Sequence, residues 1–128
     1  MKEIIIIISI LAIIIGGDIF VNKYLDNSSK NLIKGLNNLK EGINQNQNTN
    51  EKLIREANEI YNKWQKTDEK WAIIVLHSEL DLIETSLIKM KTEVEENNLD
   101  IAQEELQTSI FLINHISEKE KFCLKNVF

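Results

Sequence analysis

The sequence predicts an all-α protein in which an N-terminal transmembrane helix is followed by a small antiparallel helical bundle of two αα-hairpins. Residues 4–21 are almost entirely apolar, with Asp18 as their one ionisable side chain. The chain has no proline and four glycines among 128 residues, which favours long uninterrupted helices. Beyond residue 31, apolar residues recur three and four positions apart, as on one face of a helix. We expect a membrane anchor over 1–24 and a helical domain over 25–128.

The apolar run needs a nonpolar environment along its whole length. A helix over residues 4–21 rises about 27 Å, close to the roughly 30 Å of hydrocarbon in a bilayer. A lone segment in lipid must satisfy its own backbone groups, so these isoleucines are expected in a helix although they favour strands in water. Residues 4–21 are therefore predicted to contact the lipid bilayer directly.

A cleaved signal peptide is the alternative to an uncleaved anchor. The basic start at Lys2 and the apolar core suit both. The cleavage-site criterion fails, because Gly16, Gly17 and Asp18 are followed by the apolar residues 19–21. We expect an uncleaved, single-pass signal-anchor in the cell membrane, with the C-terminal domain extracytoplasmic.

The first hairpin is predicted over about 28–67. Its first helix either is capped by Ser28 or Ser29 or runs on from the membrane segment, and its apolar stripe is Leu32, Leu36, Leu39 and Ile43. The asparagine-rich stretch 44–50 interrupts the periodicity, since its side chains compete for backbone hydrogen bonds. The second helix resumes at Glu51 with Leu53, Ala57, Ile60, Tyr61 and Trp64. A polar link is expected over 65–70.

The second hairpin is predicted over about 69–118. Its first helix has the stripe Ile73, Leu76, Leu80, Ile83, Leu87, Met90 and Val94, widened by Trp71, Val75 and Leu82. Asp100 and Gln103 have the spacing of a capping box for the last helix. The core residues of that helix are expected to be Ala102, Leu106, Ile110, Ile113 and Ile116. The apolar C-terminal tail, 119–128, is expected to pack on the bundle.

The two hairpins share a spacing. The stripe from Leu32 to Ile43 recurs 51 positions later as Ile83, Leu87, Met90 and Val94. Two similar helical hairpins in succession are compatible with a pair of TPR-like units. The all-helical prediction does not depend on this repeat.

Composition argues against several functional classes. The net charge of −5 disfavours nucleic acid as a partner, because nucleic-acid binding selects for clustered lysine and arginine. The single cysteine, Cys123, excludes an internal disulfide framework. The sequence contains no nucleophile elbow, glycine-rich phosphate loop, HExxH motif or paired CxxC. We therefore expect no enzymatic activity, no cofactor and no metal.

Several motifs are similar to those of a known family. They are Trp64-x6-Trp71, the segment His77-Ser78-Glu79-Leu80-Asp81, Asn22 to Leu25, Ser28-Ser29, His115-Ile116 and the ending from Glu120 to Phe128. Over nearly the whole chain the sequence resembles domain of unknown function family 4363, small membrane proteins mainly of spore-forming Bacillota. The resemblance implies one N-terminal membrane helix and a helical domain, with an uncharacterised role.

A candidate interaction surface comprises Trp64, Trp71, His77, Glu79 and Asp81. The two tryptophans flank the expected link and have two interpretations. They could form an aromatic groove for a partner, as tryptophans do at binding hot spots. They could instead pack on each other and close the end of the bundle, which the apolar stripes favour.

A metal-binding or hydrolytic site on the His77, Glu79 and Asp81 face is the enzyme-like alternative. His77, Asp81 and Glu84 lie at i, i+4 and i+7, and His115 is expected at the opposing level of an antiparallel hairpin. Imidazoles and carboxylates are ligands for divalent metals, but His115 is expected to point away from the seam. The simpler interpretation is an i,i+4 pair between His77 and Asp81.

Three hypotheses about function follow. The first is a non-enzymatic, membrane-anchored protein-interaction module whose partner is another membrane protein. The second is the metal-binding or hydrolytic site. The third is a structural homo-oligomer joined through the stripe from Leu32 to Ile43.

Overall fold

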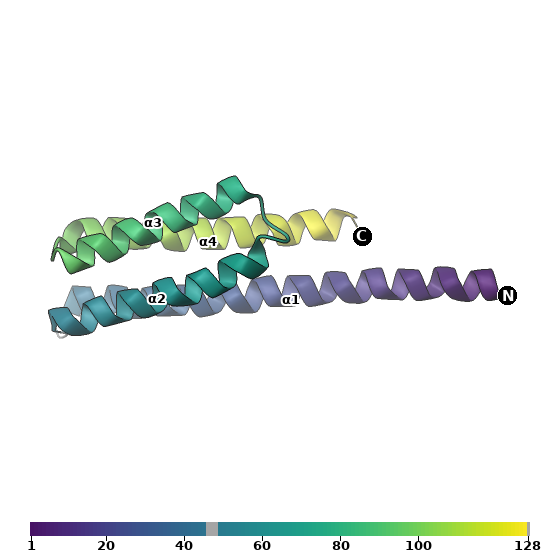
Figure 1. Ribbon diagram of the computed structural model, residues 1–128, viewed down its shortest axis with the longest axis horizontal. Helices are drawn as coiled ribbons and strands as arrows, with labels where there is room; N and C mark the ends of the chain where they lie inside the picture. Colours follow the sequence, from purple (N-terminus) through teal and green to yellow (C-terminus); the bar gives the residue numbers. More distant parts are fainter. Residues whose placement is uncertain (46–48, 128) are drawn as a thin grey trace.

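The computed structural model describes residues 1–45 and 49–127, with side chains described as far as Lys121. Its described part contains four helices and no strand: α1 (Lys2–Gln45), α2 (Asn50–Trp71), α3 (His77–Glu95) and α4 (Leu99–Val127). Successive helices run in opposite directions, and the N-terminal half of α1 projects beyond the other three (Figure 1). The predicted all-α class, with a long apolar leading helix and a bundle behind it, is confirmed.

The four helices form a closed ring. Each packs against two neighbours, with α1 against α2 and α4, and α3 against α2 and α4. TPR-like units would stack as an open array, with the first and last helices of the pair apart. Here α4 lies along α1, so the two hairpins are confirmed but the TPR-like arrangement is wrong. Each hairpin buries its apolar face against the other, which leaves no concave surface between repeats.

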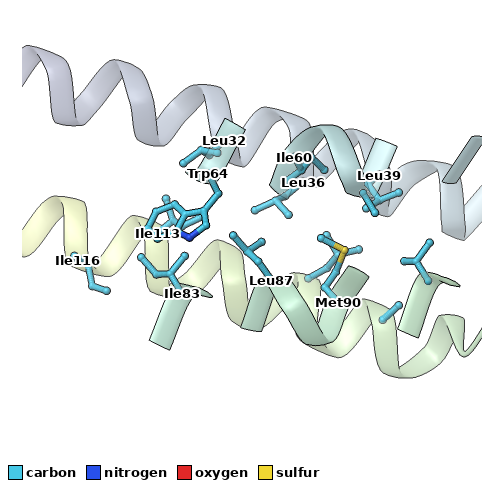
Figure 2. Packing of buried hydrophobic residues seen from close by; sticks show 14 of the residues in the cluster. Leu32, Leu36, Leu39, Ile60, Trp64, Ile83, Leu87, Met90, Ile113 and Ile116 are labelled. Atoms are coloured by element: carbon cyan, nitrogen blue, oxygen red, sulfur yellow. The ribbon is translucent and has the colours of Figure 1, made fainter. Parts of the chain in front are cut away.

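One core fills the ring, and it contains the predicted stripes. Figure 2 shows side chains of α1 and α2 facing those of α3 and α4 across it. The buried hydrophobic members are Leu25, Leu32, Leu36, Leu39, Ile43, Leu53, Ala57, Ile60, Trp64, Trp71, Val75, Leu80, Ile83, Leu87, Met90, Val94, Ala102, Leu106, Ile113 and Ile116. Because the stripe from Leu32 to Ile43 is buried inside its own bundle, it cannot join a second copy. That form of the homo-oligomer hypothesis is wrong.

Helix α1 has no break between the expected anchor and the bundle. Its apolar first half is exposed from Ile4 to Phe20 except at the half-buried Asp18, and full burial begins at Leu25. Among the described residues, this helix alone is long and apolar enough to cross a membrane, a test that a signal sequence also passes. Ser28 and Ser29 lie inside the helix and cap nothing, so the first bundle helix runs on from the apolar segment.

The link between α2 and α3 differs from the prediction. The polar stretch 65–70 belongs to α2, because Trp71 continues the buried face of Trp64 seven residues later. The turn is instead Ala72–Leu76, where the expected core residues Ile73 and Leu76 are 87% and 66% exposed. Leu82, expected to widen the core face, is 56% exposed. Only Val75 of the link is buried.

The other helix ends have identifiable signals. Thr49 caps α2, its Oγ1 accepting a hydrogen bond from the Lys52 amide at 3.3 Å. Helix α3 ends at Glu95, and Asn97 just beyond it has a φ of 62°, the left-handed conformation that asparagine tolerates.

Three further predictions concern the start of α4, the asparagine-rich stretch and the C-terminal tail. The capping box at Asp100 is wrong, because α4 already begins at Leu99 and the Gln103 amide donates to Asn44 Oδ1 at the end of α1. Of the asparagine-rich stretch, residues 46–48 lie outside the described part. The expected packing of the C-terminal tail also falls there, since its side chains beyond Lys121 are not described.

Candidate functional site

The two tryptophans of α2 pack on each other inside the bundle. Their rings meet edge to face, with centroids 6.0 Å apart and planes at 83°. Both side chains are 0% exposed. The two rings therefore pack on each other inside the bundle, and neither can form the wall of a surface groove.

Each buried indole N–H has a partner on another helix. Trp64 Nε1 donates to Glu84 Oε2 of α3 at 2.5 Å, and Trp71 Nε1 donates to Ser28 Oγ of α1 at 2.9 Å. Ser28 Oγ in turn donates to the Tyr24 carbonyl oxygen at 2.7 Å. A buried tryptophan normally needs such a partner, so these bonds fix α2 against both of its neighbours.

Glu84 joins α2 to α3 through its two carboxylate oxygens. Oε1 accepts a hydrogen bond from the Tyr61 hydroxyl at 2.5 Å while Oε2 accepts the one from Trp64. The hydrogen bond to Glu84, followed by burial, raises the pKa of Tyr61 above its usual value. Short bonds to an ionised acceptor are stronger than neutral ones. Both carboxylate oxygens of Glu84 are therefore engaged in hydrogen bonds between α2 and α3, so Glu84 is not free to bind a metal.

His77, Glu79 and Asp81 lie at the start of α3 but do different things. His77 and Asp81 are exposed on the surface. Glu79 faces α4 and pairs with Lys119, with 17% of its side chain exposed. Burial and the neighbouring Glu79 raise the pKa of the Glu120 carboxyl. The candidate interaction surface is thus reduced to His77 and Asp81, with Glu79 at its edge, and it stays a prediction.

The hydrolytic or metal-binding arrangement is not assembled. Within residues 1–45 and 49–121, no three His, Cys, Asp or Glu side chains are placed to hold a metal ion. His115 is exposed on α4 and stacks on Phe111, with ring centroids 5.5 Å apart and planes at 8°. His115, expected at the level of His77 but pointing away from the seam, therefore has its ring neighbour one turn away on its own helix.

Asp68 lies near the acidic side chains of Glu84 and Asp81, and the sequence pattern did not single it out as a candidate. Burial raises the pKa of this carboxyl, and the nearby charges of Glu84 and Asp81 raise it further against the opposing effect of His77. Asp68 lies on the last turns of α2, in a stretch that looks like a polar link in the sequence. Only the continuation of α2 to Trp71 brings it beside α3.

Polar contacts also join α1 to α4. Lys121 Nζ donates to Asp26 Oδ1 at 2.9 Å, and Lys30 pairs with the other oxygen at 2.9 Å. These bonds hold the pKa of the Asp26 carboxyl below its usual value. Close to this pair along the same two helices, Ser117 Oγ donates to Ser29 Oγ at 3.3 Å. The contacts hold α4 along α1 and so help to close the ring.

A surface hollow of about 420 Å³ lies where the apolar half of α1 leaves the bundle. Its lining comes from α1 and from the link region, and consists of Phe20, Val21, Tyr24, Lys70, Ile73 and Ile74. Lys70 Nζ stands 5.7 Å from the centroid of the Tyr24 ring. The lining contains no carboxylate, histidine, serine or cysteine. The feature is an apolar recess with one cation at its rim.

The fold and these contacts define a four-helix bundle carried on a long apolar helix, with both buried indole N–H groups hydrogen-bonded to neighbouring helices. The chain belongs to the family described as Domain of unknown function (DUF4363), whose model matches residues 19–127. The match covers the whole bundle and the last part of the apolar segment. Comparisons with curated proteins and with solved structures find no match.

Proposed function

We propose that this protein is a non-enzymatic, membrane-anchored helical module that binds another membrane protein of the bacterial envelope. The observation that carries the proposal is the exposed apolar half of α1. Ten large aliphatic side chains between Ile4 and Ile15 are exposed, namely Ile4, Ile5, Ile6, Ile7, Ile8, Ile10, Leu11, Ile13, Ile14 and Ile15. An exposed apolar surface of this extent is unfavourable in water and suits the hydrocarbon of a bilayer.

The continuity of α1 supports anchoring in preference to cleavage. The same helix provides Leu25, Leu32 and Leu36 to the bundle core, so the apolar segment is a direct extension of a packed element. A bundle built on such a helix is held at a defined height and orientation. An orientation with the C-terminal domain outside the cytoplasm is part of the proposal.

The arrangement of polar groups supports a binding role over a catalytic one. The carboxylate best placed for chemistry, Glu84, accepts hydrogen bonds from Tyr61 and Trp64. The exposed pair at the start of α3, His77 and Asp81, is the part of the candidate surface available to a partner. Because the closed bundle has no groove between repeats, a partner would contact the outer faces of the helices.

The first experiment tests the anchor. Membranes from cells producing the full-length protein are washed with alkaline carbonate, which releases peripheral proteins and retains integral ones. We expect the full-length chain in the pellet at the mass of the uncleaved sequence. A shortened chain in the soluble fraction would contradict anchoring.

The second experiment tests the binding surface. The protein is captured from detergent-solubilised membranes as wild type, as His77→Ala/Asp81→Ala, and as the control Glu104→Ala/Gln107→Ala on the exposed face of α4. We expect a membrane-protein partner to be lost in the first variant and retained in the control. Equal retention in all three would exclude the start of α3 as the binding surface.

A further inference from the structure

The link between α2 and α3 is unusual for a solvent-exposed turn. Its five residues, Ala72–Leu76, carry no polar side chain, although turns in water are normally rich in Gly, Asn, Asp and Ser. Ile73 is 87% exposed and Leu76 is 66% exposed. Packing within the bundle does not account for these two side chains, because Val75 alone in the link is buried.

The link lies at the end of the bundle from which the apolar half of α1 projects (Figure 1). Ile73 and Ile74 line the same hollow as Phe20 and Val21, the last apolar residues of the expected span. The tip of the link is therefore level with the place where α1 would leave the hydrocarbon. The turn between α3 and α4 lies at the opposite end of the bundle (Figure 1).

The first four backbone N–H groups of the link are already satisfied by internal hydrogen bonds. The amides of Ala72, Ile73, Ile74 and Val75 donate to carbonyl oxygens of Asp68, Lys70 and Trp71, at 2.7–3.3 Å. Unsatisfied backbone groups are what normally keeps irregular segments out of lipid. Four successive N–H groups of this turn can leave water at little cost.

The rim of the hollow has the chemistry of a membrane interface. The Tyr24 ring and the Lys70 ammonium lie together beside the link, with Lys70 Nζ 5.7 Å from the ring centroid. Aromatic rings with a polar end and lysines with long apolar stems are the residues that favour the headgroup level. Trp71, bonded to Ser28, holds the end of α2 on α1 and so fixes the height of the link.

We propose that the link Ala72–Leu76 is a second membrane contact, with Ile73 and Leu76 inserted at the headgroup–acyl boundary beside the end of α1. The proposal rests on the proposed anchoring of α1. With two contacts at one end, the bundle stands on the membrane surface in a single rotational setting. The outer face at the start of α3 then lies at a constant distance from the lipid.

The experiment measures the environment of single labels in the full-length protein. Cys123→Ser removes the one native thiol. Single cysteines replace Ile73, Leu76, Ile10 or Ile101, and each is labelled with an environment-sensitive fluorophore. The proteins are reconstituted in vesicles of phosphatidylcholine and phosphatidylglycerol, with iodide as the aqueous quencher and a spin-labelled phosphatidylcholine as the lipid quencher.

Two of these positions are controls. Ile101, 47% exposed at the start of α4, is an apolar site at the far end of the bundle. Ile10 lies inside the expected span and reports on anchoring itself. Circular dichroism confirms that each variant keeps its helix content, which is expected because all four side chains are exposed.

We expect the labels at Ile73 and Leu76 to be quenched from the lipid, with iodide quenching several-fold weaker than at Ile101. Iodide quenching equal to that at Ile101, with Ile10 protected, would overturn the link contact and leave the anchor standing. Protection from iodide without lipid quenching would show that protein covers the link, which also overturns the proposal. An iodide-accessible Ile10 would overturn the anchor and the link contact together.

Discussion

The hydrogen bond between Trp64 and Glu84 is expected to be worth more than the neutral bond between Trp71 and Ser28. Both tryptophans are fully buried, and each N–H has one partner on a neighbouring helix. A hydrogen bond to a charged group contributes about 1.5–3 kcal/mol, whereas a neutral one contributes about 0.5–1.5 kcal/mol. The two pairs therefore form an internal comparison within one bundle.

The perturbation is Glu84→Ala. It removes the acceptor of the buried Trp64 N–H, which cannot reach water, and also that of Tyr61, which is half-buried and can reach it. Counting the Trp64 bond in full and the Tyr61 bond as replaced by water, we expect a loss of about 1.5–3 kcal/mol in the free energy of unfolding. Glu84→Gln keeps an acceptor without the charge and should lose about half as much.

The assay is urea unfolding of the full-length protein in a non-ionic detergent, followed by far-ultraviolet circular dichroism. A double-mutant cycle combines Glu84→Ala with Trp64→Phe and isolates the pair from the other effects of each change. The control cycle combines Ser28→Ala with Trp71→Phe. We expect coupling of about 1.5 kcal/mol or more in the first cycle and about 1 kcal/mol or less in the second. Coupling below about 0.5 kcal/mol in the Trp64–Glu84 cycle would refute the reasoning.

Three further predictions concern single positions. Because the pKa of Asp68 is raised in the fold, its ionised form is disfavoured there, and Asp68→Asn should raise the free energy of unfolding at pH 7. The gain should disappear as the pH falls through the raised pKa towards the usual value of 3.8. A constant gain in urea titrations across that pH range would contradict this prediction. At Gly35, an added Cβ would meet Ile60 Cγ1 at 3.4 Å, an ordinary contact distance. Because alanine has a higher helix propensity than glycine, Gly35→Ala should stabilise α1 by somewhat less than about 1 kcal/mol. A lower unfolding midpoint would show that the contact is too tight. Asn97 has a φ of 62°, so Asn97→Ala should cost about 1 kcal/mol while Asn97→Gly should not, and equal melting temperatures for the two variants would argue against this.

The apolar segment and the bundle share one continuous helix, α1. In a protein with a flexible linker after its span, the orientation of the soluble domain would vary. Here the helix that leaves the apolar segment is the helix that supplies Leu25 and Leu32 to the core. The Asp26–Lys121 pair and the Ser29–Ser117 bond then hold α4 along the same helix.

Local pattern was sufficient for the helices and for most of the core. A stripe such as Leu80, Leu87 and Val94 depends only on the 3.6-residue period, so its burial could be predicted without knowing what covers it. The same logic failed at Ile73, Leu76 and Leu82, which continue the period but are exposed. A periodic pattern does not say where the helix begins or how much of its face a neighbour covers.

The helical class, the position of the apolar leading segment and most of the core residues could be predicted from the sequence, because they depend on spacing along one helix. The packed bundle was needed to show that α4 closes the ring against α1, that Glu84 and Ser28 are the partners of the two tryptophans, and that the apolar link lies beside Phe20. Those partners are 20 and 43 residues apart in the chain. Their pairing depends on which faces of different helices meet, and that is set by packing the whole core at once, so no local pattern carries it.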